Sequence, residues 1–294
     1  MRSHDSYALL DVGDGARLER FGDRVVDRPH PAAFGARADP GRWREADLRF
    51  DRERGWTGPA GIDLPWPIAI EGLTLELRAT PAGQVGIFPE HLAMLPWLEA
   101  RIAARHAETA GSAGGGSAGG GPPGPAVLHL FAYTGLVTLA IARAGGAVSH
   151  VDSSRPTVAW ARRNAERSDL ATRPIRWIVD DALDFTRREA RRGHRYAGVV
   201  LDPPSYGHGP AGRPWRFEDD LDGLLEGLAT VVEPDGFVLL TAHTPGFDGD
   251  RLAERLGRVL PHSGAAIDRA ELELRTADGR GLELGAFARW SGGA

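Results

Sequence analysis

The amino-acid sequence predicts an α/β fold, in which a mostly parallel sheet carries helices on both faces and a small β-rich module precedes it. Three observations lead to this prediction. From residue 126 onward, short apolar runs alternate with longer amphipathic segments, a pattern typical of βαβ units. Before residue 90, shorter β-like runs are separated by Gly, Pro and Asp. Between these regions lies a stretch dominated by Gly and Ser.

The β-rich N-terminal module is expected over residues 1–89, and a connecting helix over residues 90–109. The helix is predicted because apolar residues recur at helical spacing despite Pro96. Expected strands in the module are 8–12, 16–21, 66–70, 73–79 and 84–88.

Residues 110–125 read AGSAGGGSAGGGPPGP, a composition that cannot form a packed core. We interpret this segment as a flexible linker between two domains. A long surface loop inside one globule is the alternative interpretation.

The second domain is expected over residues 126–294. Expected strands are 126–131, 147–152, 174–179, 196–202 and 236–242, and expected helices are 136–145, 155–170, 181–192, 217–232 and 248–260. A hairpin over 270–290, turning at residues 277–279, is expected to close one edge with an antiparallel pair. Right-handed βαβ connections between these elements predict a Rossmann-like sheet.

Composition excludes several classes of protein. The net charge of -5 and the pI near 6.1 argue against coating nucleic acid by bulk charge, although a local basic groove remains compatible. The 294 residues contain no cysteine, which excludes disulfides, cysteine metal sites and a cysteine nucleophile. No His, Asp and Glu cluster shows metal-ligand spacing. The N-terminus does not resemble a signal peptide and no apolar stretch is long enough to span a membrane, so we expect a cytoplasmic protein.

The candidate ligand-binding residues follow the predicted strands, because ligands of such sheets bind at the carboxyl ends of the strands. Phe131, Ala132, Tyr133, Thr134 and Gly135 follow the first strand. The glycine lets backbone N–H groups approach a ligand, and the next helix offers its positive end. An ordinary strand-to-helix turn without a ligand could have the same sequence, and it is the alternative interpretation. The absence of G-x-G-x-x-G argues against a dinucleotide site.

Acidic residues follow the second and third strands. Asp152 lies about twenty residues beyond the first turn, where a carboxylate can accept hydrogen bonds from ribose hydroxyls. Capping of the next helix is the alternative, with Ser153 and Ser154 as competing caps. After the third strand, Asp180 and Asp181 can accept a hydrogen bond from an adenine amino group, or cap the following helix.

The most specific phrase follows the fourth strand and reads Asp202-Pro203-Pro204-Ser205-Tyr206. Two prolines fix the backbone and remove two donors, so that local carbonyls can point at a ligand. The aromatic ring of Tyr206 can stack on a planar group. Acceptors next to a stacking ring suit a planar amine.

Together these phrases resemble the class I S-adenosylmethionine-dependent methyltransferases. LHLFAYTG, HVDSS, VDDALDF and LDPPSYGHGP occur in the order and spacing of that family, and the branch of bacterial large-subunit ribosomal RNA base methyltransferases is the most similar. The resemblance covers roughly residues 84 to 290, and the N-terminal module also resembles the small domain of that branch. The domain over 126–294 is thereby identified as an S-adenosylmethionine-binding catalytic domain.

The resemblance implies a role for each phrase. Residues 131–135 line the methionine end of the cofactor, and Asp152, followed by Ser153, holds the ribose hydroxyls. Asp181 and Ala182 lie at the adenine, and residues 202–206 flank the methyl group and receive the substrate. Residues 88–91 are expected to close over the cofactor.

The sequence departs from part of the family. Relatives that methylate carbon-5 of a pyrimidine use a cysteine after the fifth strand, where this chain has Thr241, Ala242, His243 and Thr244. Carbon methylation through a cysteine adduct is therefore excluded, and a base nitrogen is favoured. His243 is a candidate general base, with an ordinary hydrogen-bonded loop residue as the alternative.

Two further groups have open interpretations. Arg187, Arg188, Arg191, Arg192, His194 and Arg195 form the densest basic run. These residues either contact RNA phosphates or form the solvated end of a helix. We favour the helix end, because cations stabilise a helix C-terminus. Arg213, Trp215 and Arg216 suit either a mobile lid or packing.

The sequence therefore predicts a methyltransferase that acts by direct in-line transfer on a base nitrogen, with ribosomal RNA as its substrate and partner. A small-molecule or protein substrate is the first alternative. A non-catalytic RNA-binding factor that retains the fold is the second, and a nucleotide-dependent oxidoreductase is a remote third.

Overall fold

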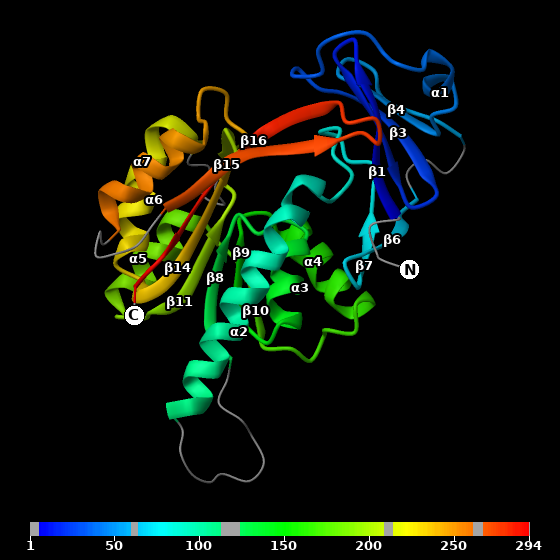
Figure 1. The fold of residues 1–294 in the computed structure, drawn as a ribbon. Helices are drawn as coiled ribbons and strands as arrows, with labels where there is room; N and C mark the ends of the chain where they lie inside the picture. The colour runs from blue at the N-terminus through cyan, green and yellow to red at the C-terminus, as the bar shows by residue number, and fades with distance from the viewer. Residues whose placement is uncertain (1–5, 60–63, 113–123, 209–213, 261–266, 294) are drawn as a thin grey trace. The chain divides into compact units, whose positions relative to one another are not determined.

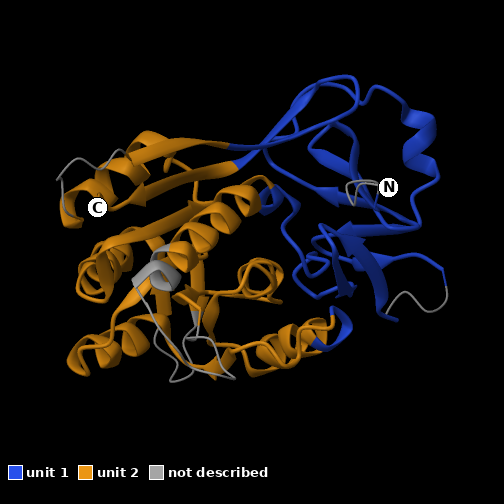
Figure 2. Ribbon diagram, turned by 60° about the horizontal axis from the view of Figure 1, so that its bottom comes forward, with its two compact units in different colours: residues 1–92, 166–168, 272–284 blue, residues 93–165, 169–271, 285–294 orange. Residues whose placement is uncertain are grey.

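The computed structural model describes residues 6–59, 64–112, 124–208, 214–260 and 267–293. The chain forms two compact units (Figure 2). The first contains residues 1–92, 166–168 and 272–284, and the second contains 93–165, 169–271 and 285–294. Most of the predicted linker, residues 113–123, lies outside the described residues.

The first unit is rich in strands. A five-stranded sheet has the order β1-β2-β3-β4-β5, and β6 pairs with β7 as a separate hairpin. The elements are β1 (Tyr7–Gly13), β2 (Ala16–Phe21), β3 (Arg24–Pro29), α1 (Pro40–Arg44), β4 (Leu48–Asp51), β5 (Gly55–Thr57), β6 (Trp66–Ile70) and β7 (Leu73–Leu77). This confirms the β-rich N-terminal module.

The expected strand over residues 84–88 does not form. The backbone N–H of Arg78 donates to Val85 O at 3.0 Å, so the chain does fold back after β7. Gly86, however, has φ of 109°, which lies outside the extended region and ends any ladder. The apolar run leads instead into a 3-10 helix, η2 (Pro89–Met94), and then into α2 (Leu95–Ser112).

A seven-stranded sheet has the order β10-β9-β8-β11-β14-β16-β15 and belongs to the second unit, except for residues 272–284 at the end of the β15–β16 hairpin. Strands β10, β9, β8, β11 and β14 are parallel, and β16 runs antiparallel to β14. The strands are β8 (Ala126–Leu130), β9 (Ala147–Asp152), β10 (Ile175–Val179), β11 (Tyr196–Leu201), β14 (Val232–Ala242), β15 (Ile267–Arg275) and β16 (Gly281–Ser291). The structure therefore confirms the mostly parallel sheet and its closing hairpin.

Helices cover both faces of this sheet (Figure 1). Helix α2 packs on α3, whereas α5, α6 and α7 pack in succession on the other face. The helices are α3 (Leu136–Arg143), α4 (Arg155–Arg167), α5 (Ala182–Arg191), α6 (Phe217–Ala229) and α7 (Gly249–Val259). No helix in the described part of the chain is both long and apolar enough to cross a membrane.

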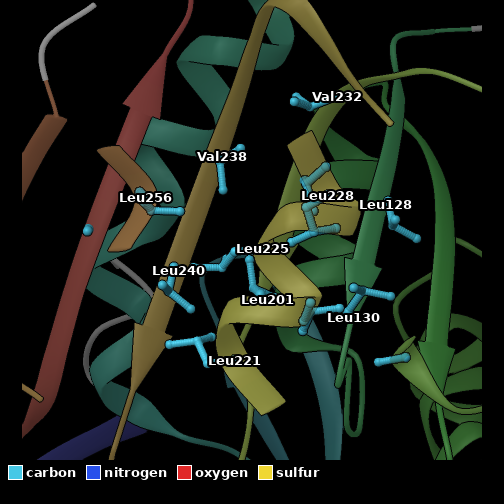
Figure 3. Packing of buried hydrophobic residues seen from close by; sticks show 14 of the residues in the cluster. Leu128, Leu130, Leu201, Leu221, Leu225, Leu228, Val232, Val238, Leu240 and Leu256 are labelled. Atoms are coloured by element: carbon cyan, nitrogen blue, oxygen red, sulfur yellow. The ribbon is translucent and has the colours of Figure 1, made fainter. Parts of the chain in front are cut away.

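The main hydrophobic core lies between the sheet and the α5–α7 face (Figure 3). Leu201 and Leu240 project from neighbouring strands towards Leu221 and Leu225 of α6, and all four are at most 1% exposed. Burying a leucine side chain contributes about 1.5–3 kcal/mol, so this layer fixes the sheet that carries the strand ends.

On the opposite face, the sheet requires a glycine. A Cβ atom at Gly198 of β11 would lie 2.1 Å from Cζ of Phe237, whose ring packs edge-on against Trp97 of α2 with centroids 5.6 Å apart. The ring of Phe237 therefore occupies the space of the missing side chain.

We expect Gly198→Ala to destabilise the second unit by about 1–3 kcal/mol, because Phe237 must leave its position against Trp97. Gly223→Ala is the matched control, since no atom lies within 4 Å of its Cβ position inside α6. It should raise stability by about 0.5–1 kcal/mol through helix propensity. Urea unfolding of both variants measures this, and equal stability of the two would contradict the packing argument.

Candidate functional site

Strand order places the candidate site. The chain runs outward from β8 through β9 to β10 and then returns to pair β11 with the other side of β8. This reversal is the switch point at which ligands of parallel sheets bind. The carboxyl ends of β8, β9, β10 and β11 meet at this edge, so the predicted residues after each strand become neighbours.

The turn after β8 has an unusual backbone. Phe131, Tyr133 and Gly135 have φ of 53°, 49° and 93°, so every second residue lies in the left-handed region. Gly135 is the N-cap of α3, and a Cβ there would lie 3.2 Å from the Cβ of Ala161 on α4. Both the conformation and the close approach therefore require glycine.

Not every residue of this turn faces outward. Ala132 and Thr134 are 3% and 0% exposed. The carbonyl oxygen of Thr134 accepts a hydrogen bond from Asn164 Nδ2 at 2.9 Å, which ties the turn to α4.

Asp152 ends β9 and binds the first turn. Its Oδ2 accepts a hydrogen bond from Tyr133 N at 3.0 Å, and its Oδ1 accepts from Ser154 N at 2.9 Å. Ser154 itself precedes α4 and accepts from Thr157 N at 3.3 Å, so the serine takes the capping position. Burial raises the pKa of the Asp152 carboxyl above its usual value, against the two backbone hydrogen bonds that favour its charged form.

The acids after β10 have structural partners. Asp181 is the N-cap of α5, where its Oδ1 accepts from Leu183 N at 2.9 Å and from Asp184 N at 3.1 Å. Asp180 pairs with Arg188. The capping alternative is therefore realised for Asp181, and its contact with adenine stays a prediction.

A shallow pocket of about 40 Å³ lies at this edge and joins all four strand ends. Its lining includes Phe131, Asp152, Ser153, Asp181, Ala182, Pro204 and Trp215. The structure thus brings together predicted residues from four separate segments of the chain.

The Asp202 carboxylate is held by the end of the neighbouring strand. Its Oδ1 accepts a hydrogen bond from Thr241 Oγ1 at 2.6 Å and lies 3.3 Å from His243 Nε2. Both partners follow from the parallel pairing of β11 with β14. His243 is therefore beside the Asp-Pro-Pro turn, as its position after the fifth strand predicts.

Trp215 supports the Asp-Pro-Pro turn from a small hairpin that local sequence patterns do not indicate, β12 (Tyr206–His208) and β13 (Pro214–Arg216). Trp215 Nε1 donates to Pro204 O at 2.7 Å, and its ring lies 5.0 Å from that of Phe131. Because it is only 6% exposed, Trp215 is a packing residue, which settles one of the two open interpretations. Arg213 lies outside the described residues. By contrast, the side chain of Tyr206 is 78% exposed.

A buried histidine pair supports α3 behind the first turn. Thr138 Oγ1 of α3 lies 2.7 Å from Nδ1 of His129 and 2.9 Å from Nδ1 of His150. Burial lowers the pKa of His150 well below its usual value, which keeps this ring neutral. The threonine therefore joins α3 to both β8 and β9. Hydrophobic periodicity carries no signal for this contact.

Part of the chain is similar in sequence to known proteins. No family model matches the chain. The chain is 32% identical over 129 residues to the ribosomal RNA large subunit methyltransferase K/L of Methylococcus capsulatus, which covers 43% of this chain and 17% of the relative. It is 29% identical over 136 residues to the ribosomal RNA large subunit methyltransferase K of Neisseria meningitidis, covering 44% of this chain and 37% of the relative. The chain therefore spans only a minor part of these curated relatives.

A solved structure matches nearly the whole chain. The SAM-dependent methyltransferase from Agrobacterium tumefaciens is 32% identical, covers 97% of this chain and 90% of its own, and superposes with a TM-score of 0.87. A putative methyltransferase complexed with SAH, 16% identical with a TM-score of 0.71, shares the fold. The predicted family and its cofactor agree with these matches: the chain belongs to the S-adenosylmethionine-dependent methyltransferases.

Proposed function

We propose that this chain transfers a methyl group from S-adenosylmethionine to a nitrogen atom of a base in ribosomal RNA. The observation that carries the proposal is the exposed ring of Tyr206, which lies two residues after the second proline of the Asp-Pro-Pro turn. The named activity of the curated relatives on large-subunit ribosomal RNA supports the choice of substrate.

The residues at the switch point fit the cofactor. The Asp152 carboxylate, fixed by two backbone N–H groups, is suited to accept hydrogen bonds from ribose hydroxyls. Phe131 and Ala182 supply apolar walls of the same pocket, and the missing side chain of Gly135 allows close approach of the first turn. When bound, S-adenosylmethionine supplies an electrophilic methyl group on a sulfonium, which an amine lone pair can take.

Fewer groups are available to accept a hydrogen bond from the substrate amine than the sequence indicates. Trp215 takes up one lone pair of the Pro204 carbonyl, so we assign the amine first to the Asp202 carboxylate and the Pro203 carbonyl. Tyr206 would stack on the plane of the base and orient its lone pair. Holding donor and acceptor in line is the main task of such a catalyst, since positioning alone can account for a large part of the barrier.

Charge also favours nitrogen transfer at this turn. Positive charge develops on the acceptor nitrogen as it gains the methyl group, and a fixed carboxylate beside it stabilises that charge. Thr241 of β14 donates a hydrogen bond to the Asp202 carboxylate, which makes it a positioning residue, and His243 Nε2 lies 3.3 Å from the same oxygen. The covalent route to carbon methylation needs a cysteine, which this chain lacks.

The proposal is tested by transfer of labelled methyl groups. The protein and labelled S-adenosylmethionine are incubated with RNA, protein and small-molecule fractions from cells that lack the gene. Label in ribosomal RNA supports the proposal, and mapping identifies the base and atom. Label only in the protein or small-molecule fraction would support methyltransferase activity but reject RNA as the substrate. The net charge of -5 makes such a substrate the natural alternative.

Asp202→Ala should lower kcat by at least about 100-fold, because the amine loses its charged acceptor and its alignment. Asp202→Asn keeps the shape and serves as the matched variant for folding. The affinity for S-adenosylmethionine, measured by calorimetry, should stay within a few fold of wild type in both. Full activity of Asp202→Ala would reject the assignment.

Tyr206→Ala should raise KM for RNA by roughly 5- to 150-fold, the equivalent of the 1–3 kcal/mol that base stacking contributes. Tyr206→Phe retains the ring and should stay close to wild type. If both variants behave alike, the ring does not stack on the base.

Asp152 should make cofactor binding sensitive to acid. The ionised carboxylate accepts hydrogen bonds from the ribose hydroxyls, so the affinity for S-adenosylmethionine should fall as the carboxylate becomes protonated. Because the pKa of Asp152 is raised, this fall should begin at a higher pH than for an ordinary aspartate, whose pKa is near 3.8. Asp152→Asn should bind about tenfold more weakly at neutral pH and lose this dependence, since a charged hydrogen-bond partner is removed. A wild-type dissociation constant that is constant down to pH of about 4 would be inconsistent with the role.

A further inference from the structure

A second and larger pocket lies at the opposite edge of the same sheet. It has a volume of about 410 Å³ and is lined by the first residues of four strands, Ala126 of β8, Ala147 of β9, Ile175 of β10 and Tyr196 of β11. These are the amino ends of the parallel strands, whereas the cofactor and substrate belong at the carboxyl ends. The pocket is therefore distinct from the methyl-transfer site.

The lining of this pocket is strongly cationic. Arg173, Arg176 and Arg195 contribute to it, together with His194. Within the described residues, no carboxylate forms an ion pair with any of the three arginines. Positive charge that folding leaves uncompensated in one concave place attracts anions, in a protein whose overall charge is negative.

Buried polar contacts fix one wall of the pocket. Glu189 is fully buried, and its Oε2 lies 2.7 Å from His194 Nδ1 and accepts a hydrogen bond from Tyr196 OH at 2.7 Å. Burial and this carboxylate raise the pKa of Tyr196 to about 12, so its hydroxyl remains protonated. The histidine and tyrosine are thus held by a carboxylate that is itself hidden from the pocket's ligand.

Two of the arginines are also oriented. Arg176 donates to Ser149 Oγ at 3.4 Å, and Arg195 donates to the Val232 carbonyl at 3.1 Å. Each guanidinium has five N–H donors, so one such contact leaves the rest of the planar fork available for an anion.

The basic run at residues 187–195 separates into two groups in the structure, and only one of them lines the pocket. Arg187, Arg188 and Arg192 pair with carboxylates on or beside α5, as expected for a helix end. Arg195 instead joins Arg173 and Arg176, which come from the segment before and within β10. Folding, and not proximity in sequence, assembles this group.

We propose that this pocket binds backbone phosphates of the RNA substrate, away from the base that is methylated. The inference rests on the proposed function, because it takes RNA as the ligand. Strands β10 and β11 have five and six residues, so the two edges are separated by roughly 17–20 Å. That is less than one turn of a nucleic-acid duplex, about 34 Å. This distance is a straight line through the sheet, so an RNA that contacts both edges must bend around the unit, and phosphate contacts at the second edge would fix its position on the enzyme.

The test is equilibrium binding of large-subunit ribosomal RNA, taken from cells that lack the gene, at salt concentrations from about 50 to 200 mM. The triple variant Arg173→Gln, Arg176→Gln and Arg195→Gln is compared with wild type. A matched triple variant replaces Arg187, Arg258 and Arg269 by Gln, since each of these is exposed and paired with an acid. It removes the same charge elsewhere in the same unit.

The pocket variant should bind RNA at least about tenfold more weakly. The slope of log affinity against log salt should fall by about 0.7–0.9 for each RNA phosphate that an arginine no longer neutralises. Its KM for RNA should rise while kcat and the affinity for S-adenosylmethionine stay near wild type. The matched variant should show a small change in affinity.

The outcomes separate the two proposals. If wild type methylates RNA but the pocket variant binds RNA with unchanged affinity and salt slope, the pocket has no such role and the proposed function stands. If wild type binds RNA through the pocket without methylating it, the proposed function fails and the pocket remains. If wild type neither binds nor methylates RNA, both are wrong.

Discussion

The pairing of β8 with β11 is the constraint on which the rest of the second unit depends. Strands β9 and β10 follow β8 on one side, and the chain then returns so that β11 pairs with the other side of β8. The order of the strands therefore reverses between β8 and β11. The first turn and the Asp-Pro-Pro turn therefore emerge side by side, although about seventy residues of sequence separate them. The apolar layer between the sheet and α5, α6 and α7 holds this pairing in place.

The residues around the switch point are fixed largely by one another. Asp152 accepts from the backbone of the first turn, Trp215 donates to the Asp-Pro-Pro turn, and Thr241 donates to Asp202. The first and third of these contacts join two different strand ends of the sheet, and the second joins the Asp-Pro-Pro turn to β13. Such pre-organisation is what a reaction limited by alignment requires, because the groups need not be ordered when the substrate arrives. Tyr206 is the contrasting residue, since its ring is exposed.

The two edges of the parallel sheet differ in chemistry. The carboxyl edge has Asp152, Asp181 and Asp202, which suit hydroxyl and amine donors. The amino edge has arginines, which suit phosphates. This separation is compatible with the proposed RNA substrate despite the net charge of -5, because the arginines are gathered in one place away from the acidic edge.

Local sequence is enough to specify the class of fold, the alternating strands and helices of the parallel sheet after residue 126, the closing hairpin and the family, but not the small β12–β13 hairpin. These features depend on periodicity and on short phrases at strand ends, which neighbouring residues specify. The prediction was wrong at residues 84–88, where an apolar run resembles a strand but Gly86 leaves the extended region. For Asp152 and Asp181 the sequence left both ligand and cap open, because both uses need an acid at the same position, although the spacing of Asp152 favoured the ligand.

The structure shows which of these side chains caps a helix, and the ligand roles stay predictions. Ser154 takes the cap of α4 and leaves Asp152 on the first turn, whereas Asp181 itself caps α5. The contact of Trp215 with Phe131, the contact of Thr138 with His150 and the grouping of the pocket arginines arise between segments that are separate in sequence. The physical reason is that local patterns fix where a strand ends, but tertiary contacts fix which side chain meets which partner there.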